Sequence, residues 1–167
     1  MAIRNIRVDD DPILRKKSRE VTEFNDRLFD LLDDMKETMY HSGGVGLAGP
    51  QVGVLKRVVV MDVSEDRNDF IELINPEITF EDGAQTGVEG CLSLPGLQGT
   101  VTRPNIVKVK AQNREGKWCL YKGEALKARC VCHEIDHLDG ILYIDRISRL
   151  KRNMLLKKLE KYRKSKK

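Results

Sequence analysis

Apolar positions near the amino terminus recur at the spacing of an amphipathic helix. At helical periodicity one face of this segment collects the side chains of Leu28, Leu31, Leu32, Met35 and Met39. Asn25 or Asp26 can cap the start of the helix, and Gly43 and Gly44 follow its end. We therefore expect a helix that buries one face and leads directly into a glycine-rich segment.

The middle of the chain is rich in β-branched and aliphatic residues, which favours strands. We expect strands over residues 57–63, 70–78, 106–111 and 117–120. Residues 112–116, Gln-Asn-Arg-Glu-Gly, separate the last two and indicate a hairpin. Helical character returns over 124–138, where Gly140 provides the stop.

These elements predict an α+β fold, with small antiparallel or mixed β-sheets packed around a central helix and a further helix at the carboxyl end. The chain has 167 residues and 40% hydrophobic content, and neither a repeat nor a linker divides it, so we expect a single domain over 1–167. Four cysteines without a disulfide framework and a charged amino terminus predict a soluble, cytoplasmic protein. Its apolar runs fall short of the roughly 18 residues that span a membrane.

The helix over 124–138 carries the sequence His133-Glu134-Ile135-Asp136-His137. Residues four apart share a helix face, so His133 and His137 can hold one metal ion together. Glu134 is placed to exchange a proton with a water on that ion. The alternative is a solvated helix with two incidental histidines, but the chain has only three histidines in all. The pattern therefore predicts a metallohydrolase.

A catalytic metal usually takes three protein ligands and leaves one position open for water. Cys130 shares the helical stripe but lies about 10 Å along the axis from His137, so we expect it to line a pocket wall instead. Cys91 is the best third ligand, because residues 89–93, Glu-Gly-Cys-Leu-Ser, include a glycine that lets the backbone come close to a ligand. The weaker candidates are Cys119, Cys132 and His41.

Three segments resemble the three motifs of peptide deformylase, in the same order and over nearly the whole chain. They are Gly44-Val45-Gly46-Leu47-Ala48-Gly49-Pro50-Gln51, Glu89-Gly90-Cys91-Leu92-Ser93 and His133-Glu134-Ile135-Asp136-His137-Leu138. The chain departs from the family pattern at Gly49, where a second alanine is usual, and at Cys132, where glutamine is usual. We expect the first to loosen packing under its loop and the second to affect a hydrogen bond behind a metal ligand.

The resemblance implies hydrolysis of the formyl group from the amino-terminal formylmethionine of newly made proteins, which releases formate and a free amino terminus. It implies that Cys91, His133 and His137 hold one divalent metal ion. A ligand set of one thiolate and two imidazoles suits several transition metals. The resemblance implies Fe(II) as the native ion, with nickel, cobalt or zinc able to substitute.

The resemblance also implies roles for residues around the metal. Glu134 would accept a proton from the attacking water and return it to the leaving amine. The side-chain amide of Gln51 and the backbone N–H of Leu92 would stabilise the oxyanion. Glu89 and Arg103 would form a buried ion pair that orients the loop carrying the cysteine ligand.

The substrate side follows from the same layout. Gly44-Val45-Gly46 offers an open backbone edge on which a peptide can dock as an added strand. Leu126 and Cys130 lie on the metal side of the helix and can wall a pocket for a methionine side chain. Arg129 is an unusual neighbour for such a pocket, and the sequence leaves open whether it faces the pocket or the rim. A cramped site beside the metal would admit a formyl group and exclude larger acyl groups.

The carboxyl end carries a separate signal. Residues 149–167 hold ten Lys or Arg and one Glu, a net charge of +9 in a chain whose total is +4. Leu150, Met154, Leu155, Leu159 and Tyr162 give part of this stretch an apolar side. We expect a basic amphipathic helix and tail over about 148–167. It is either a solvated terminal helix or a surface that meets ribosomal RNA, since phosphates attract basic stretches.

Two other functions use the same motif. A small H-E-x-x-H metalloprotease would cleave peptides internally and would have no need for an N-formyl group. A non-catalytic, ribosome-associated module would hold a structural metal, which normally has four protein ligands, and the sequence offers no convincing fourth. We favour peptide deformylase, acting on N-formylmethionyl nascent peptides without a membrane partner.

Overall fold

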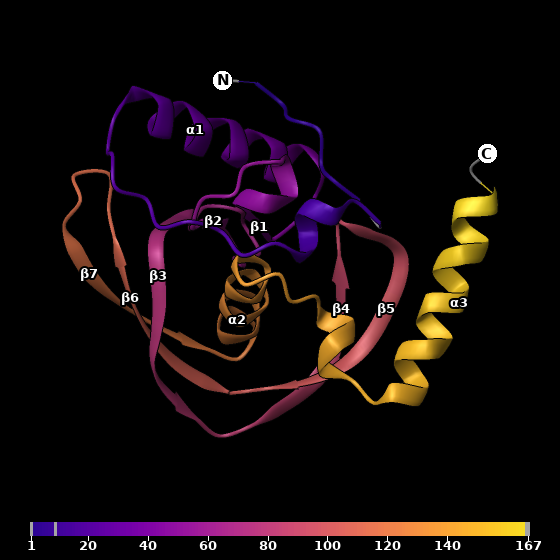
Figure 1. The fold of residues 1–167 in the computed structure, drawn as a ribbon. Helices are drawn as coiled ribbons and strands as arrows, with labels where there is room; N and C mark the ends of the chain where they lie inside the picture. Colours follow the sequence, from indigo (N-terminus) through magenta and orange to yellow (C-terminus); the bar gives the residue numbers. More distant parts are fainter. Residues whose placement is uncertain (1, 9, 166–167) are drawn as a thin grey trace.

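Two antiparallel sheets flank a central helix in a computed structural model, which describes residues 2–8 and 10–165 (Figure 1). Residues 166 and 167 of the basic tail expected from the sequence lie outside the described residues. The helices are α1 (Asp26–His41), α2 (Leu126–Leu138) and α3 (Arg149–Ser165), with short 3-10 helices η1 (Pro12–Arg15), η2 (Gly49–Val52) and η3 (Tyr143–Arg146). The strands are β1 (Gly46–Ala48), β2 (Val58–Met61), β3 (Ile71–Asp82), β4 (Gln85–Cys91), β5 (Leu94–Arg103), β6 (Ile106–Gln112) and β7 (Trp118–Glu124).

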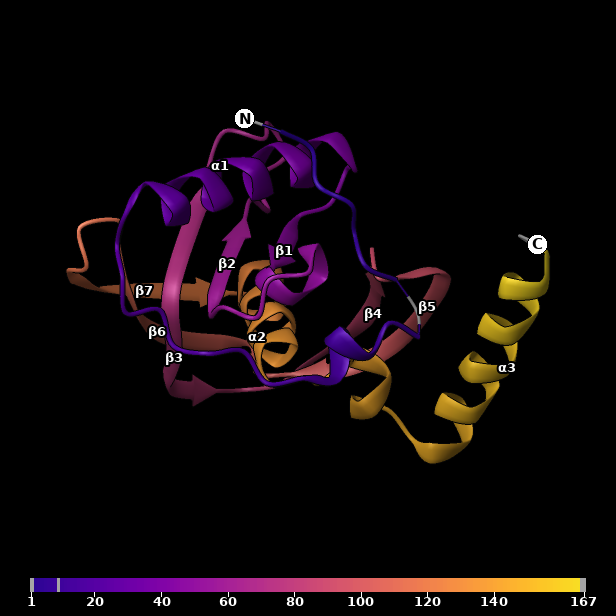
Figure 2. The same ribbon diagram turned by 45° about the horizontal axis from the view of Figure 1, so that its top comes forward.

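The larger sheet has the order β1-β2-β3-β6-β7, whereas β4 and β5 form a separate hairpin. Successive residues of a strand point to opposite faces. Val58 and Val60 accordingly pack with α1, while Val59 and Met61 pack with α2. The strand β2 therefore joins two hydrophobic cores. Figure 2 shows α1 above this sheet and α2 between the sheet and the β4–β5 hairpin.

The helix expected from the first apolar pattern is confirmed. Asn25 is its N-cap and accepts a hydrogen bond from the backbone N–H of Leu28. The apolar residues that predicted it are all at most 4% exposed, namely Leu28, Leu31, Leu32, Met35 and Met39. Gly43 follows with a φ of +75°, a conformation that glycine adopts without strain. The polypeptide can therefore turn at once from α1 toward β1.

Several element boundaries differ from those expected. The strand expected over 57–63 is shorter, and those expected over 70–78 and 117–120 are longer. Because β7 continues to Glu124, the helix expected to begin there begins at Leu126 instead. Ala125 separates the two elements with a φ of +53°.

The hairpin of β4 and β5 was not expected. Glycines at 87, 90, 96 and 99 lower the intrinsic strand preference of this segment. Antiparallel pairing from Gln85–Arg103 to Cys91–Leu94 stabilises it nonetheless. The hairpin packs with η3 and α3 in a third core, so tertiary contacts outweigh local preference.

The helix α3 lies on the outer side of β5 (Figure 1). Leu155 and Leu159 are buried against the hairpin, while Leu150 and Met154 are exposed. The α+β fold with antiparallel sheets, a central helix and a helix at the carboxyl end is thus confirmed. The single domain over 1–167 stays a prediction. Across the described ranges, no helix has both the length and the apolar content needed to cross a membrane.

Candidate metal centre and active site

Three potential metal ligands from two parts of the fold converge. Cys91 ends strand β4, and His133 and His137 lie one turn apart on α2. Their ligand atoms all lie within 4.8 Å of one another, and Cys91 Sγ is 3.3 Å from His137 Nε2. The expected ligands are therefore brought together, whereas Cys119, Cys132 and His41 are not in this cluster.

The electrostatics of the cluster suit a cation. Burial acts to lower the pKa of His133, but contacts with Cys91, Glu89 and Glu134 outweigh it and raise that pKa to about 10. The surroundings of this imidazole thus favour a positive charge. Burial lowers the pKa of His137 well below its ordinary value, so this ring is neutral and can offer a lone pair to a metal. A cysteine and two histidines with these properties fit a transition-metal ion.

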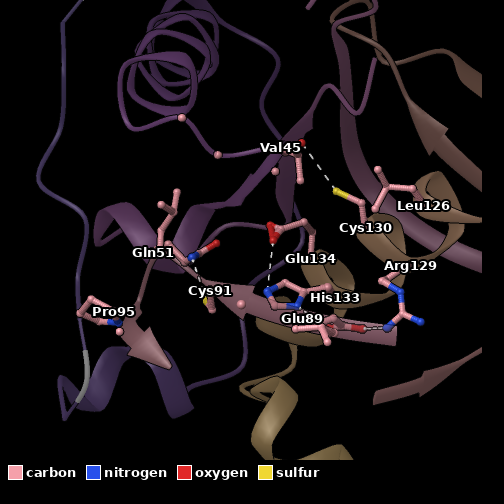
Figure 3. A pocket seen from close by; sticks show the side chains of 17 residues that line it. Val45, Gln51, Glu89, Cys91, Pro95, Leu126, Arg129, Cys130, His133 and Glu134 are labelled. Atoms are coloured by element: carbon pink, nitrogen blue, oxygen red, sulfur yellow. Dashed lines mark hydrogen bonds and ion pairs between the residues drawn. The ribbon is translucent and has the colours of Figure 1, made fainter. Parts of the chain in front are cut away.

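Glu134 lies beside His133 and lines a pocket (Figure 3). Its Oε1 is 3.7 Å from His133 Nε2, and the residue is only 3% exposed. Burial raises the pKa of Glu134 to about 7. Its Oε2 is buried and has no hydrogen-bond partner among the described residues. A carboxylate of this kind can exchange a proton near neutral pH.

The side-chain amide of Gln51 is fixed at its oxygen and directed toward the cysteine. Gln51 lies in η2 and is 1% exposed. Its Oε1 accepts the backbone N–H of Ala48 at 3.0 Å, which leaves Nε2 pointing to Ser93 Oγ at 3.1 Å and to Cys91 Sγ at 3.7 Å. Leu92 lies between β4 and β5 and also lines the pocket. Both residues therefore border the space beside the cysteine.

The pocket has a volume of about 500 Å³ and contains every substrate-side residue expected from the sequence. These are Gly44, Val45, Gly46, Leu126 and Cys130. A Cβ at Gly46 would lie 2.8 Å from Cys130 Sγ and 3.0 Å from Glu134 Cγ, so a larger residue would displace these side chains. Because β1 ends the sheet, one side of its backbone is open to a further strand.

A buried ion network lies behind His133. Glu89 accepts two hydrogen bonds from Arg103, both at 2.9 Å, and a third from His133 Nδ1 at 2.9 Å. Although burial acts to raise the pKa of Glu89, the contacts with His133 and Arg103 outweigh it and lower that pKa to about 2. The carboxylate thus stays ionised and fixes the orientation of the imidazole.

Comparisons with known proteins identify the family of this chain. A family model described as polypeptide deformylase matches residues 3–153. The chain belongs to the peptide deformylase family. It is 62% identical over 147 residues to a peptide deformylase of Alkaliphilus metalliredigens, covering 88% of this chain and 98% of the relative.

Solved peptide deformylase structures have the same fold. The enzyme from Legionella pneumophila is 45% identical, with a TM-score of 0.93 over 99% of this chain and 98% of that one. The enzyme from Synechococcus elongatus, solved in complex with actinonin, is 39% identical, with a TM-score of 0.87 over 92% of this chain and 85% of that one. Peptide deformylases are metal-dependent hydrolases, and the Cys-His-His cluster here is a site that can bind such a metal.

Arg129 in this peptide deformylase lies on the pocket side of α2. The sequence had left open whether it faces the pocket or the rim. It is 7% exposed, and its Nη1 donates to Glu89 Oε2 at 2.6 Å and to the carbonyl oxygens of Gly87 and Val101. The guanidinium therefore ties α2 to both strands of the hairpin. The sequence carried no charge pattern that would have placed this arginine, because its partners are far away in the chain.

Asp136 and Tyr143 are site residues that the sequence reasoning missed. Asp136 accepts hydrogen bonds from Arg103 at 2.7 Å and from Arg146 at 2.7 and 3.0 Å, which extends the deformylase ion network. The ring of Tyr143 stacks on His133, with centroids 6.1 Å apart. Asp136 lies within the metal motif and could have been considered, whereas the sequence gave no signal for Tyr143.

The two departures from the deformylase motifs differ in their consequences. The expectation that Gly49 loosens its loop is wrong, because a Cβ there would lie 2.6 Å from the carbonyl oxygen of Lys56 and 2.8 Å from that of Val54. The loop is packed directly onto the glycine. Cys132 is buried outside the ligand cluster, and burial raises the pKa of its thiol to about 11. Its expected effect on a hydrogen bond stays a prediction.

Proposed function

We propose that this protein removes the formyl group from the amino-terminal formylmethionine of nascent peptides. The observation that carries the proposal is the convergence of Cys91, His133 and His137 beside the buried carboxylate of Glu134, which lines the pocket. Membership of the peptide deformylase family supports it. A cytoplasmic location follows from the proposed substrate, because formylated chains emerge from ribosomes there.

The proposed reaction is a hydrolysis in which Glu134 moves the proton. When bound, a divalent ion held by Cys91, His133 and His137 would supply Lewis-acid chemistry. Glu134 takes a proton from the attacking water as the water oxygen bonds to the formyl carbon. It then delivers a proton to the amine nitrogen as the C–N bond breaks, which yields formate and a free amino terminus.

Developing negative charge on the formyl oxygen requires donors that are already in place. We assign this role to Gln51 Nε2 and to the backbone N–H of Leu92. The hydrogen bond from Ala48 to Gln51 Oε1 supports the assignment, because it fixes the amide with its donor toward Cys91. To Glu89 we assign the orientation of His133, through the hydrogen bond from Nδ1, and to Arg103 the fixing of the Glu89 carboxylate.

For the substrate, we propose that the peptide docks along Gly44-Val45-Gly46 and that its methionine side chain lies near Leu126 and Cys130. The close approach of Gly46 to Glu134 leaves little room beside the carboxylate. A formyl carbon carries only hydrogen, whereas an acetyl carbon carries a methyl group that would have to enter this space. Comparable rates on formyl- and acetyl-methionyl peptides would contradict this basis of selectivity.

Fe(II) is the ion that we propose for the native enzyme, with nickel, cobalt or zinc able to occupy the same ligands. The thiolate of Cys91 supports a soft transition metal over magnesium or calcium. Metal analysis of protein purified without oxygen tests the assignment. Activity of the iron form should decay in air, while the nickel form should persist. A native preparation loaded with zinc alone would contradict it.

The decisive experiment measures formate release from an N-formylmethionyl tripeptide. We expect the Glu134→Gln variant to lose about 10²–10⁴-fold in rate while it retains its metal, because it keeps the shape of the side chain but cannot carry the proton. Glu115→Gln, an exposed change on the hairpin turn, is the control and should have no effect. Absence of formate release by metal-loaded protein, or internal cleavage of unformylated peptides, would overturn the proposal.

We further propose that α3 brings the enzyme to the ribosome through contacts with ribosomal RNA. Leu155 and Leu159 attach the helix to the hairpin, and the exposed side carries Lys157, Lys158 and Lys161. Neutralisation of phosphates by such side chains makes binding weaken with salt. The affinity for ribosomes should therefore fall steeply as salt is raised.

Two charge-reversal variants distinguish the effect of the α3 lysines from the effect of the net charge of the protein. Replacing Lys157, Lys158 and Lys161 by Glu should weaken ribosome binding and leave formate release from a free tripeptide unchanged. Replacing the exposed Lys16, Lys117 and Lys122 by Glu changes the net charge equally on other elements and is the control. Equal effects of the two sets, or binding that ignores salt, would contradict a role for α3.

A further inference from the structure

The backbone edge on which the peptide is proposed to dock lies in a glycine-rich segment, residues 43–46. Three of the four residues 43–46 are glycines, which have the greatest conformational freedom in an unfolded or loose segment. The segment connects α1 to the edge strand β1 and borders the pocket. A docking edge must be fixed before the peptide arrives, since ordering it on binding would weaken affinity.

The loop after β2 supplies the missing constraint. Arg67 Nη2 donates to the carbonyl oxygen of Gly44 at 2.6 Å, and its Nη1 donates to the carbonyl oxygen of Asp62 at 2.7 Å. The backbone N–H of Asp62 in turn donates to the carbonyl oxygen of Val45 at 2.8 Å. Two consecutive carbonyls of the docking edge are thus held by one loop. Arg67 itself does not line the pocket.

The loop that holds the edge is itself fixed by Asp62. This side chain is fully buried and accepts hydrogen bonds from Tyr40 Oη at 2.6 Å and from the backbone N–H of Ser64 at 3.0 Å. The guanidinium of Arg67 lies over the ring of Tyr40, 4.8 Å from its centroid. Arg67 has a φ of +56°, in the left-handed region that few non-glycine residues occupy.

We propose that Arg67 is a positioning residue that fixes Gly44 and Val45 for peptide docking. It acts through the backbone of Gly44, and it neither touches the reacting atoms nor lines the pocket itself. The inference rests on the proposed function, in which the peptide pairs with this edge. Loss of Arg67 then impairs binding of the peptide backbone and leaves the chemistry at Cys91, His133 and Glu134 intact.

A longer peptide pairs with more of the edge than formylmethionine amide does, so the effect of losing Arg67 must grow with peptide length. We expect Arg67→Ala to raise KM about tenfold for an N-formylmethionyl tripeptide, the effect of losing one well-placed hydrogen bond to the edge. For formylmethionine amide KM should change less than about twofold, and kcat should be unchanged for both.

Two further variants separate positioning from general stability. Arg67→Lys keeps the charge but has one donor nitrogen in place of two, and should restore part of the tripeptide affinity. Arg114→Ala is the matched control, because Arg114 also bridges distant elements, with hydrogen bonds to Glu72 and Asp33 and its guanidinium over the ring of Phe29. It should lower thermal stability without a length-dependent change in KM.

A binding measurement keeps the test independent of catalysis. Calorimetry with the deformylated product Met-Ala-Ser should show weaker binding to Arg67→Ala, and amide hydrogen exchange at residues 43–46 should be faster. An unchanged KM, the same KM increase at both peptide lengths, or the same increase in Arg114→Ala would overturn the proposal. If the unaltered protein releases no formate, the proposed function fails, while faster exchange at 43–46 still reports whether Arg67 fixes the edge.

Discussion

The guanidinium of Arg129 and the carboxylate of Glu89 form the shortest contact of the ion network behind the metal ligands, at 2.6 Å between Nη1 and Oε2. Glu89 also binds Arg103 and the imidazole of His133. One buried carboxylate thus connects the hairpin strand that carries Cys91 to the helix that carries both histidines. We therefore expect changes to Glu89 or its partners to affect both the stability of the fold and metal binding.

Removing the charge of Arg129 should destabilise the fold. We expect Arg129→Met to lower the free energy of unfolding by about 1.5–3 kcal/mol, the range for a hydrogen bond to a buried charged group. Urea denaturation measures the effect. Arg27→Met, an exposed change on α1, should stay within about 0.5 kcal/mol. Equal stability of the two variants would show that the contact of Arg129 with Glu89 contributes nothing.

Neutralising Glu89 should weaken metal binding more than folding. Its carboxylate accepts the Nδ1 hydrogen of His133 and so orients the ring toward the cluster. We expect Glu89→Gln to lower metal affinity about 10–100-fold, as measured by competition with a chelator. Glu81→Gln, an exposed change on β3, serves as the control. Unaltered affinity in Glu89→Gln would mean that the orientation of His133 depends on α2 alone.

Restoring the alanine that the family usually carries at position 49 should harm this protein. The Cβ of Gly49→Ala would meet the backbone oxygens of Lys56 and Val54, which can move only with the loop. We expect a loss of about 1–3 kcal/mol in the free energy of unfolding. A Cβ at Gly90 has its nearest contact at 3.6 Å, so Gly90→Ala is the control. A neutral Gly49→Ala would show that the loop is free to withdraw.

The contact between Tyr40 and Asp62 should make stability depend on pH at both extremes. Burial acts to raise the pKa of Asp62, but hydrogen bonds from Ser64 and Tyr40 outweigh it and lower that pKa to about 2. The stability that the ionised carboxylate contributes is present above its ordinary pKa of 3.8 and is lost as the pH falls toward 2.

At the alkaline end the sign is reversed. Burial and the hydrogen bond to Asp62 raise the pKa of Tyr40 from 10.0 to about 12. Its contribution is therefore complete below pH 10 and is lost as the pH rises toward 12. Denaturation across pH 2–12 should show a smaller loss at both ends in Tyr40→Phe than in the unaltered protein. Parallel curves would exclude this pair as a source of the pH dependence.

The parts of the fold that the sequence predicted well are those with strong local patterns. The apolar stripe of α1 and its Asn25 cap are local features, and they define the helix almost to the residue. The hairpin of β4 and β5 has no such pattern, because its glycines weaken it and its stability comes from packing against η3 and α3. Elements of this kind are specified by distant contacts and cannot be identified from local preference.

The site shows the same division. His133 and His137 follow from helical spacing, and Cys91 follows from its place beside a glycine. The resemblance to a known family supplied Gln51, Leu92, and the pairing of Glu89 with Arg103. Arg129 and Tyr143 contact their partners only in the tertiary fold. Arg129, for example, is 40 positions from Glu89 in the sequence. Pattern reasoning could not orient them.

The ligand set also has a mechanical consequence for the molecule. Cys91 and His137 are 46 positions apart in sequence and belong to the hairpin and to α2. An ion bound between them closes that span of chain like a covalent cross-link, and closing a long loop removes freedom mainly from the unfolded chain. A bound metal ion therefore cross-links the β4–β5 hairpin to α2. In the apo protein, the contacts between these two elements should open first.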